Sequence, residues 1–137
     1  MDNTDLYERE VEKLWNQGNL AVADELVADD FVDHYTGVEG PAGYKELVCG
    51  FRQAFPDLEF EIHHLYEVDE ETVVGHWTMR GTNEGPYFGR PATGASVEMP
   101  GIDIVTFRDG QLVENYEVAD ERGLLEQLEA DRPARRP

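Results

Sequence analysis

The apolar residues in the first part of the chain recur at the spacing of an α-helix. Residues 4–17 carry one apolar stripe, formed by Tyr7, Val11, Leu14 and Trp15, at the i, i+4, i+7 and i+8 positions of one helix face. A second helix is predicted over about residues 20–28. A third begins at Gly40-Pro41, since proline suits the first helical position, and ends before Pro56. Residues 31–35 are predicted to form a short connection.

After Pro56 the apolar residues alternate with polar ones, as they do in half-buried strands. Strands are predicted over residues 58–66, 72–82, 96–108 and 111–119, and Asp109-Gly110 is typical of a hairpin turn between the last two. Pro100-Gly101 is expected to mark a bulge or bend. A last short helix is predicted over about residues 121–129, where leucines recur.

Strict alternation assigns side chains to faces. His64 shares a face with Ile62, so His63 is expected on the opposite face. In the next strand Trp77 lies on one face, and His76 and Arg80 lie on the other. In the last strand Glu114, Tyr116, Val118 and Asp120 share one face.

This element order predicts one α+β domain over residues 1–130, followed by a loose tail over residues 131–137. Helices segregated from an antiparallel sheet pack on one of its faces, and a long bent sheet with helices across its concave side encloses a cavity. Such cavities bind small, largely apolar ligands. A small hydrophobic molecule is therefore the expected partner.

The charge of the chain is strongly negative, with 30 acidic against 11 basic residues and a net charge of −19. Nucleic acid and anionic membrane surfaces are excluded as partners, because both require basic side chains. The acids form either an interaction face or a surface adapted to high salt. Their spread along the whole chain favours the salt-adapted surface, and hence a halophilic source.

The sequence lacks the residue spacing that a metal site requires. The four histidines and the single Cys49 show no metal-ligand spacing, so no metal is expected. Cys49 is predicted to be a small buried core residue. The acidic start, Met1–Asp5, is unlike a secretory signal, which favours a cytoplasmic location.

Two segments carry a family resemblance. Residues 81–94, GTNEGPYFGRPATG, resemble the G-T-H-x-G-x-F-x-G-x-P-x-T-G segment of the SnoaL-like polyketide cyclases, ester cyclase type, in the nuclear transport factor 2-like superfamily. Residues 107–120, FRDGQLVENYEVAD, resemble the family's F-x-D-G-K-I-x-E-x-W-x-x-x-D. The resemblance covers nearly the whole chain. It implies a cone-shaped curved antiparallel sheet with N-terminal helices across its concave face.

The resemblance also implies chemistry without a cofactor. The family's cyclases close a ring by aldol condensation, and the aspartate that matches Asp120 is their general acid/base. A carboxyl group suits this role where an apolar wall raises its pKa. Tyr116 stands where the family has Trp, and a ring there would form a wall for the substrate. The other candidate ligand-binding residues are His34, His76, Arg80 and Trp77.

Two alternatives stay open. Asp120 directly precedes the last helix and suits a helix N-cap. The whole domain is either a catalyst for aldol-type cyclisation, isomerisation or hydrolysis of a small carbonyl compound, or a non-catalytic module that binds ligands or dimerises. Asn83 and Thr106 replace a histidine and a basic residue of the family pattern, and His76 or Arg80 is a possible substitute for the missing base. The resemblance implies a homodimer formed through the exposed sheet face.

Overall fold

The computed structural model describes residues 2–130, and the predicted tail, residues 131–137, lies outside this range. The elements in chain order are α1 (Asn3–Arg9), the π-helix η1 (Glu10–Asn16), α2 (Val22–Leu26), β1 (Val27–Asp33), α3 (Gly40–Ala54), β2 (Glu59–Glu67), β3 (Thr72–Thr82), β4 (Ser96–Arg108), β5 (Gln111–Ala119) and α4 (Glu121–Ala130). The first predicted helix is thus α1 continued by η1. Within the described residues, no helix has the length and apolar character needed to cross a membrane.

The sheet has five strands in the order β1-β5-β4-β3-β2. The four predicted strands pair antiparallel, as expected. The prediction of a connection over residues 31–35 was wrong, because residues 27–33 form β1, which runs parallel to β5. The sheet is therefore mixed. β1 was missed because its burial does not alternate and its register shifts between Val27 and Val32.

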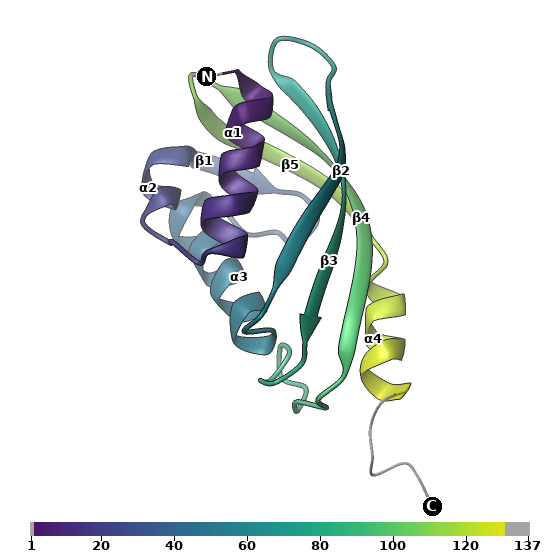
Figure 1. Cartoon of the computed structure of the whole chain (residues 1–137). Coiled ribbons are helices and arrows are strands. Elements are labelled where there is room, and N and C mark those ends of the chain that lie inside the picture. The colour runs from purple at the N-terminus through teal and green to yellow at the C-terminus, as the bar shows by residue number, and fades with distance from the viewer. Residues whose placement is uncertain (1, 131–137) are drawn as a thin grey trace, which may run out of the picture.

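Figure 1 shows α1, α2 and α3 on one side of a long, curved sheet, with α4 beside the end of β4 where that strand begins. This is the predicted α+β architecture. One hydrophobic core cluster joins the N-terminal helices to the sheet through Leu14, Phe31 and Phe107. A second cluster packs α4 and the end of α3 against β3 and β4. The cavity described below is lined by residues of both clusters, between the helices and the sheet.

A bulge in β2 overturns one side-chain assignment. The β2–β3 register shifts between Ile62 and His64, so strict alternation fails at His63. His64, which was predicted to share the face of Ile62, accordingly lies on the outer face with His63 and His76. The ring centroid of His63 is 5.1 Å from that of His76. The rings of His64 and His76 stack at 5.3 Å.

Two smaller predictions were also wrong. Pro100-Gly101 pairs with β3 in regular register, and the irregularity in the β4–β5 pairing falls between Thr106 and Phe107 instead. Cys49 is exposed, not buried. It lies next to the buried Val48 on α3, one position beyond the helix face that packs on the sheet.

Candidate functional site

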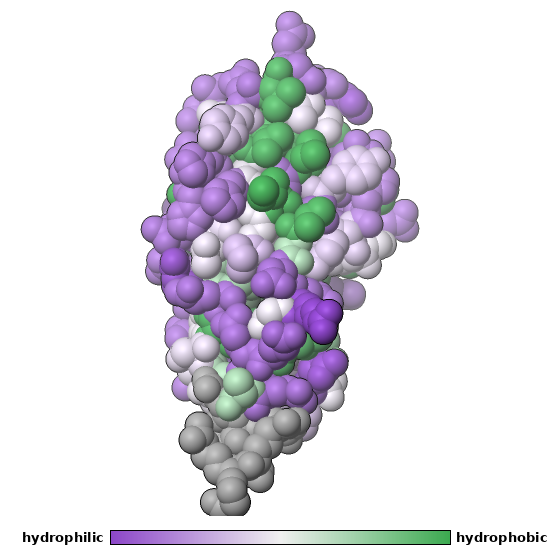
Figure 2. All heavy atoms as spheres, turned by 90° about the vertical axis from the view of Figure 1, so that its right-hand side faces the viewer, coloured by the Kyte–Doolittle hydropathy of each residue, from purple (hydrophilic) through white to green (hydrophobic). Residues whose placement is uncertain are grey.

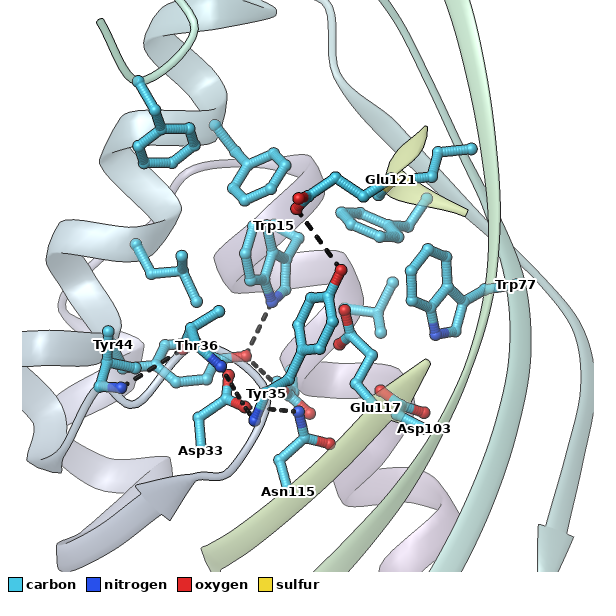
Figure 3. A pocket seen from close by; sticks show the side chains of 18 of the residues that line it. Trp15, Asp33, Tyr35, Thr36, Tyr44, Trp77, Asp103, Asn115, Glu117 and Glu121 are labelled. Atoms are coloured by element: carbon cyan, nitrogen blue, oxygen red, sulfur yellow. Dashed lines mark hydrogen bonds between the residues drawn. The ribbon is translucent and has the colours of Figure 1, made fainter. Parts of the chain in front are cut away.

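A cavity of about 480 Å³ lies between the N-terminal helices and the concave face of the sheet. Aromatic side chains form much of its wall, as Figure 3 shows. They come from every layer of the fold: Trp15, Phe51, Phe60, Trp77, Tyr87 and Phe88. Trp15 contacts Phe51 and Phe60 edge-on, with centroids 5.7 Å and 5.2 Å away. The cavity therefore suits a flat, largely apolar molecule.

Trp77 is the predicted site residue that the structure places in this wall. Its indole lies over Gly101 on the neighbouring strand, where a Cβ atom would come within 2.3 Å of the ring. Any side chain at this position would displace the indole. The glycine at position 101 thus allows the indole of Trp77 to pack directly against the backbone of β4.

Carboxyl groups occupy the polar side of the same cavity. Glu10, Asp33, Asp103 and Glu117 line it from η1, β1, β4 and β5, and Glu121 lies at the start of α4. Arg90, which is exposed, is the one basic residue among the described residues of the lining. Among residues 2–130, no three acidic, histidine or cysteine side chains are arranged to hold a metal ion.

Asp103 and Glu117 are direct partners across β4 and β5. Opposite residues of an antiparallel pair have Cβ atoms about 5 Å apart, and Figure 3 shows both carboxyl groups turned into the cavity. Burial raises the pKa of Asp103 to about 7. Burial, together with the charge of Asp103, raises the pKa of Glu117 to about 8. Both groups can therefore take up and release protons near neutral pH.

A tyrosine from the first helix holds Asp103 in place. Tyr7 Oη donates a hydrogen bond of 2.6 Å to Asp103 Oδ1. Gly75 makes room for it, because a Cβ there would come within 2.1 Å of Tyr7 Oη. Burial raises the pKa of Tyr7 far above its usual value, so the phenol remains a hydrogen-bond donor.

A third buried carboxyl group, that of Glu10, ends a chain of hydrogen bonds. Trp15 Nε1 donates to Tyr44 Oη over 2.7 Å, and Tyr44 Oη donates to Glu10 Oε2. Burial raises the pKa of Glu10 to about 8, and the hydrogen bond from Tyr44 opposes this rise. Glu10 therefore stays largely protonated up to about pH 8, whereas surface carboxyl groups are already charged above about pH 5.

Asn115 lies between Asp33 and Glu117 at the polar side of the cavity, as Figure 3 shows. Asp33 Oδ1 accepts hydrogen bonds from the backbone N–H of Tyr35 at 2.8 Å and from Asn115 Nδ2 at 3.5 Å. These contacts orient the amide, since a carboxylate can only accept. Asn115 Oδ1 is left buried with no hydrogen-bond partner among the described residues.

The family model of SnoaL-like polyketide cyclase matches residues 5–128. The chain belongs to this family. No curated protein matches the chain in sequence.

Three solved structures illustrate the likeness. A protein from Acidithiobacillus ferrooxidans, assigned as a polyketide cyclase, is 29% identical, with a TM-score of 0.81 over 93% of this chain and 94% of its own. TsrD from Streptomyces laurentii is 25% identical, with a TM-score of 0.84 over 95% and 98%. AclR from Streptomyces galilaeus, assigned as a hydroxylase, is 28% identical, with a TM-score of 0.79 over 92% and 80%.

The family motif places Asp120 differently from the cavity acids. Asp120 is exposed, and it is not among the residues that line the cavity. Its Oδ1 accepts a hydrogen bond of 2.9 Å from the backbone N–H of Gly123, in the first turn of α4. This is the geometry of a helix N-cap, the second of the two roles that the sequence left open.

His34 and Tyr116 lie together, but on the outer face of the sheet. Their rings stack with centroids 4.2 Å apart, and His34 Nε2 lies 2.9 Å from Glu114 Oε2. Tyr116 is 50% exposed. The alternation along β5 was read correctly, but the face of Tyr116 points away from the cavity, so Asn115 and Glu117 face inward instead.

His76 and Arg80 also lie on the outer face, opposite Trp77. His76 Nδ1 is 3.0 Å from His64 Nδ1. Arg80 binds Glu61 at 2.6 Å and Glu98 at 2.9 Å. Neither residue lines the cavity, and so neither substitutes there for the basic residue that Thr106 replaces.

The loop between β3 and β4 closes one end of the cavity. Asn83, fully buried, donates to the backbone oxygen of Gly85 at 2.8 Å and accepts from the backbone N–H of Thr93 at 2.8 Å. These bonds tie the two ends of the loop together and present Tyr87 and Phe88 to the cavity. The asparagine that replaces the family's histidine therefore shapes the loop.

Proposed function

We propose that the chain is a cofactor-independent enzyme that carries out acid/base chemistry on a small, hydrophobic carbonyl compound bound in the cavity. One observation carries the proposal. Asp103 and Glu117 are cross-strand partners on the concave face, inside an aromatic cavity whose burial brings both pKa values near neutrality. Groups that titrate near the working pH are the effective acid/base catalysts.

The two carboxyl groups have complementary tasks. Because like charges this close disfavour each other, the pair loses its two protons in separate steps and passes through a state with one proton and one charge. In that state the ionised member takes a proton from the carbon next to the substrate carbonyl, and the protonated member gives its proton to the carbonyl oxygen. The product is an enol, and the pair ends with its proton exchanged between members.

An enol is the common intermediate of aldol-type cyclisation and of isomerisation next to a carbonyl. The aromatic wall supports such chemistry because it excludes water and holds a planar substrate against the acids. The polyketide cyclase assignment of the Acidithiobacillus relative supports cyclisation. The hydroxylase assignment of AclR shows that one scaffold is associated with more than one reaction.

Proton exchange on a model ketone tests the proposal without the natural substrate. We would incubate 2-tetralone with the protein in D₂O near neutral pH and follow loss of its α-proton signals by NMR. The native chain is expected to accelerate exchange over buffer. Asp103→Asn and Glu117→Gln should each lower the protein's contribution by about 10²-fold or more. Glu114→Gln, which removes the same charge from the outer face of β5, should leave it unchanged.

The same ketone also distinguishes an enzyme from a non-catalytic ligand-binding module. If 2-tetralone quenches the fluorescence of Trp15 and Trp77 but exchanges no faster than in buffer, the cavity binds without catalysing. The domain is then a ligand-binding module. Equal exchange rates in the native chain and in both cavity variants would likewise end the catalytic proposal.

We also propose that two copies associate through the outer face of the sheet. Figure 2 shows hydrophobic side chains gathered on this face. The patch consists of Ile102, Ile104, Tyr116 and Val118, which are 46–77% exposed. A twofold axis brings the same uncharged patch of each copy together.

The free, exposed Cys49 supports a reducing compartment such as the cytoplasm.

A further inference from the structure

We infer that acid weakens the association of two copies, through histidines that border the patch at which the copies meet. The inference rests on the association proposed above and names its regulation. All four histidines of the chain lie on the outer face of the sheet: His34, His63, His64 and His76. Imidazole changes charge between pH 5 and 8, where most surface carboxyl groups stay ionised. This face therefore responds to pH in a range of its own.

The register of the strands sets the histidines in line with the patch. One row of direct partners crosses β2, β3, β4 and β5, and it consists of His64, His76, Ile102 and Val118. The adjacent row consists of Tyr66, Val74, Ile104 and Tyr116. Direct partners have Cβ atoms about 5 Å apart, so His76 adjoins the patch at Ile102. On the opposite side His34 stacks on Tyr116, and it lines the same surface groove as Ile104.

The charge of the chain argues for a second copy as the occupant of this patch. Carboxylates in the adjoining rows are each bound within their own copy: Glu61 to Arg80, Glu114 to His34, and Asp120 to the backbone N–H of Gly123. With a net charge of −19, contacts through other faces bring carboxylates of the two copies together. The uncharged rows of the outer face avoid this repulsion.

His64 and His76 form a pair that holds only a limited number of protons. Their Nδ1 atoms lie 3.0 Å apart, and their rings are within 4° of parallel. One nitrogen has to donate and the other has to accept, so the contact requires at least one neutral ring. The rings of His63 and Tyr66 lie beside the pair and bring no negative charge. Acid thus gathers positive charge at the border of the patch.

His34 contributes less to this response. Among residues 2–130 it is the one histidine in an ion pair, because Glu114 lies 2.9 Å away. Tyr35 and Glu117 line the same groove. A proton on His34 is offset by the carboxylate of Glu114, whereas a proton on His64 or His76 has no such partner. We therefore assign the pH response to the pair His64 and His76.

Protonation of the pair opposes association. A second copy on the patch removes water from the histidines at its border, and this desolvation disfavours the charged form of an imidazole. Both copies also carry the same positive charges at the joint surface. The separated copies consequently bind more protons than the dimer, and a fall in pH shifts the equilibrium toward monomers.

Sedimentation equilibrium at pH 8 and pH 5.5 tests the inference. The measurements would be made in 1 M NaCl, which screens the long-range repulsion of the acidic surface. We expect the dissociation constant of the native dimer to be at least ~10-fold higher at pH 5.5. Circular dichroism at both pH values would confirm that the chain stays folded.

Variants separate the histidine pair from other titrating groups. The double variant His64→Gln, His76→Gln keeps polar side chains that do not titrate, and it should lose most of the rise in the dissociation constant. Glu8→His is the control. It adds an imidazole at an exposed position of α1, on the other side of the sheet, and should show the native rise.

The outcomes distinguish this inference from the association on which it rests. A dissociation constant that is equal at the two pH values, or lower at pH 5.5, overturns the inference and leaves the dimer standing. A native rise that persists in the folded double variant also overturns it. A native chain that is monomeric at both pH values refutes the dimer and the inference together. The 2-tetralone experiment is independent of all three results, since no residue of the cavity is changed.

Discussion

Tyr7 on α1 donates its phenolic hydrogen to Asp103 on β4, 96 positions further along the chain, over 2.6 Å. The bond joins the helical layer to the acid pair of the sheet. It favours the ionised form of Asp103, whereas burial favours the protonated form. The position of Asp103 and its readiness to release a proton therefore both depend on a residue from the other end of the sequence.

Removing this hydrogen bond should alter the titration of Asp103. Tyr7→Phe is expected to raise the pKa of Asp103 further, because the ionised form loses its donor, and to destabilise the fold by about 1–3 kcal/mol. NMR titration of the carboxyl carbons and urea unfolding measure the two effects. Tyr66→Phe, at a phenol that is 56% exposed, is the control and should change neither quantity. An unchanged pKa of Asp103 in Tyr7→Phe would refute the role assigned to Tyr7.

The buried acids should make the fold less stable as the pH rises through neutrality. Glu10 has an ordinary pKa near 4.5 in an unfolded chain and a pKa of about 8 in the fold, and Glu117 behaves alike. Between these values the folded state holds more protons than the unfolded state, so a rise in pH favours unfolding. Tyr44, Tyr7, Asp33 and Asp103 face or surround these groups and supply no positive charge. The stability contributed by the protonated acids is thus present near pH 4.5 and lost by about pH 8.

Glu10→Gln tests this pH dependence, since a glutamine mimics the protonated acid and still accepts from Tyr44. Thermal unfolding between about pH 5 and pH 8 should show a smaller loss of stability in the variant than in the native chain. The variant should be the more stable of the two at pH 8. Glu8→Gln, an exposed position on the preceding turn, should show the native pH dependence. Parallel profiles for native chain and Glu10→Gln would contradict the raised pKa of Glu10.

The sequence predicted the elements whose signals are local. The helical stripe of α3 and the alternation in β2 to β5 are each contained within a short segment, and all of them formed. β1 was missed because its identity depends on a distant partner: it pairs with β5, and Val27, Ala28 and Phe31 are buried without alternating. The spacing of apolar residues within one segment does not distinguish such a strand from the end of a helix.

The predicted ligand-binding residue Tyr116 points away from the cavity for a related reason. Alternation groups Tyr116 with Val118 and Asn115 with Glu117, but it does not say which pair faces the helices. Tyr116 was assigned to the substrate wall from its place in the family motif. In the fold, Tyr116 and Val118 form part of the exposed patch, and the polar pair faces the cavity. The cavity reverses the usual rule that polar residues point outward, and Asp103 between Ile102 and Ile104 was the signal for it.

Asp120 offers a test that separates the family's catalytic assignment from the cap seen here. Asparagine caps helices about as well as aspartate but has no titratable proton, whereas alanine loses the cap. We therefore expect Asp120→Asn to keep both stability and 2-tetralone exchange, and Asp120→Ala to lose about 0.5–2 kcal/mol of stability while keeping exchange. Urea unfolding and the NMR exchange assay measure the two. Loss of exchange in a stably folded Asp120→Asn would return the acid/base role to Asp120.

The acidic surface should make folding depend on salt. With a net charge of −19, the folded chain repels itself, and the screening length falls from about 10 Å at 0.1 M salt to about 3 Å at 1 M. The midpoint of thermal unfolding is expected to rise over this range of NaCl at neutral pH. The rise should shrink near pH 4, where many surface carboxyl groups are protonated. A midpoint that does not respond to NaCl at neutral pH would count against a salt-adapted surface.

Association through the outer face should fail when a charge enters the patch. Val118 is 77% exposed at the patch, and Val68 is 60% exposed at the turn between β2 and β3. Each valine can be replaced by aspartate with the same change in charge and size. Because a twofold axis would bring both copies of Val118 to one interface, Val118→Asp should give monomers in sedimentation velocity at molar salt, where long-range repulsion is screened. Val68→Asp should sediment like the native chain, and a native chain that sediments as a monomer in molar salt would refute the proposed dimer.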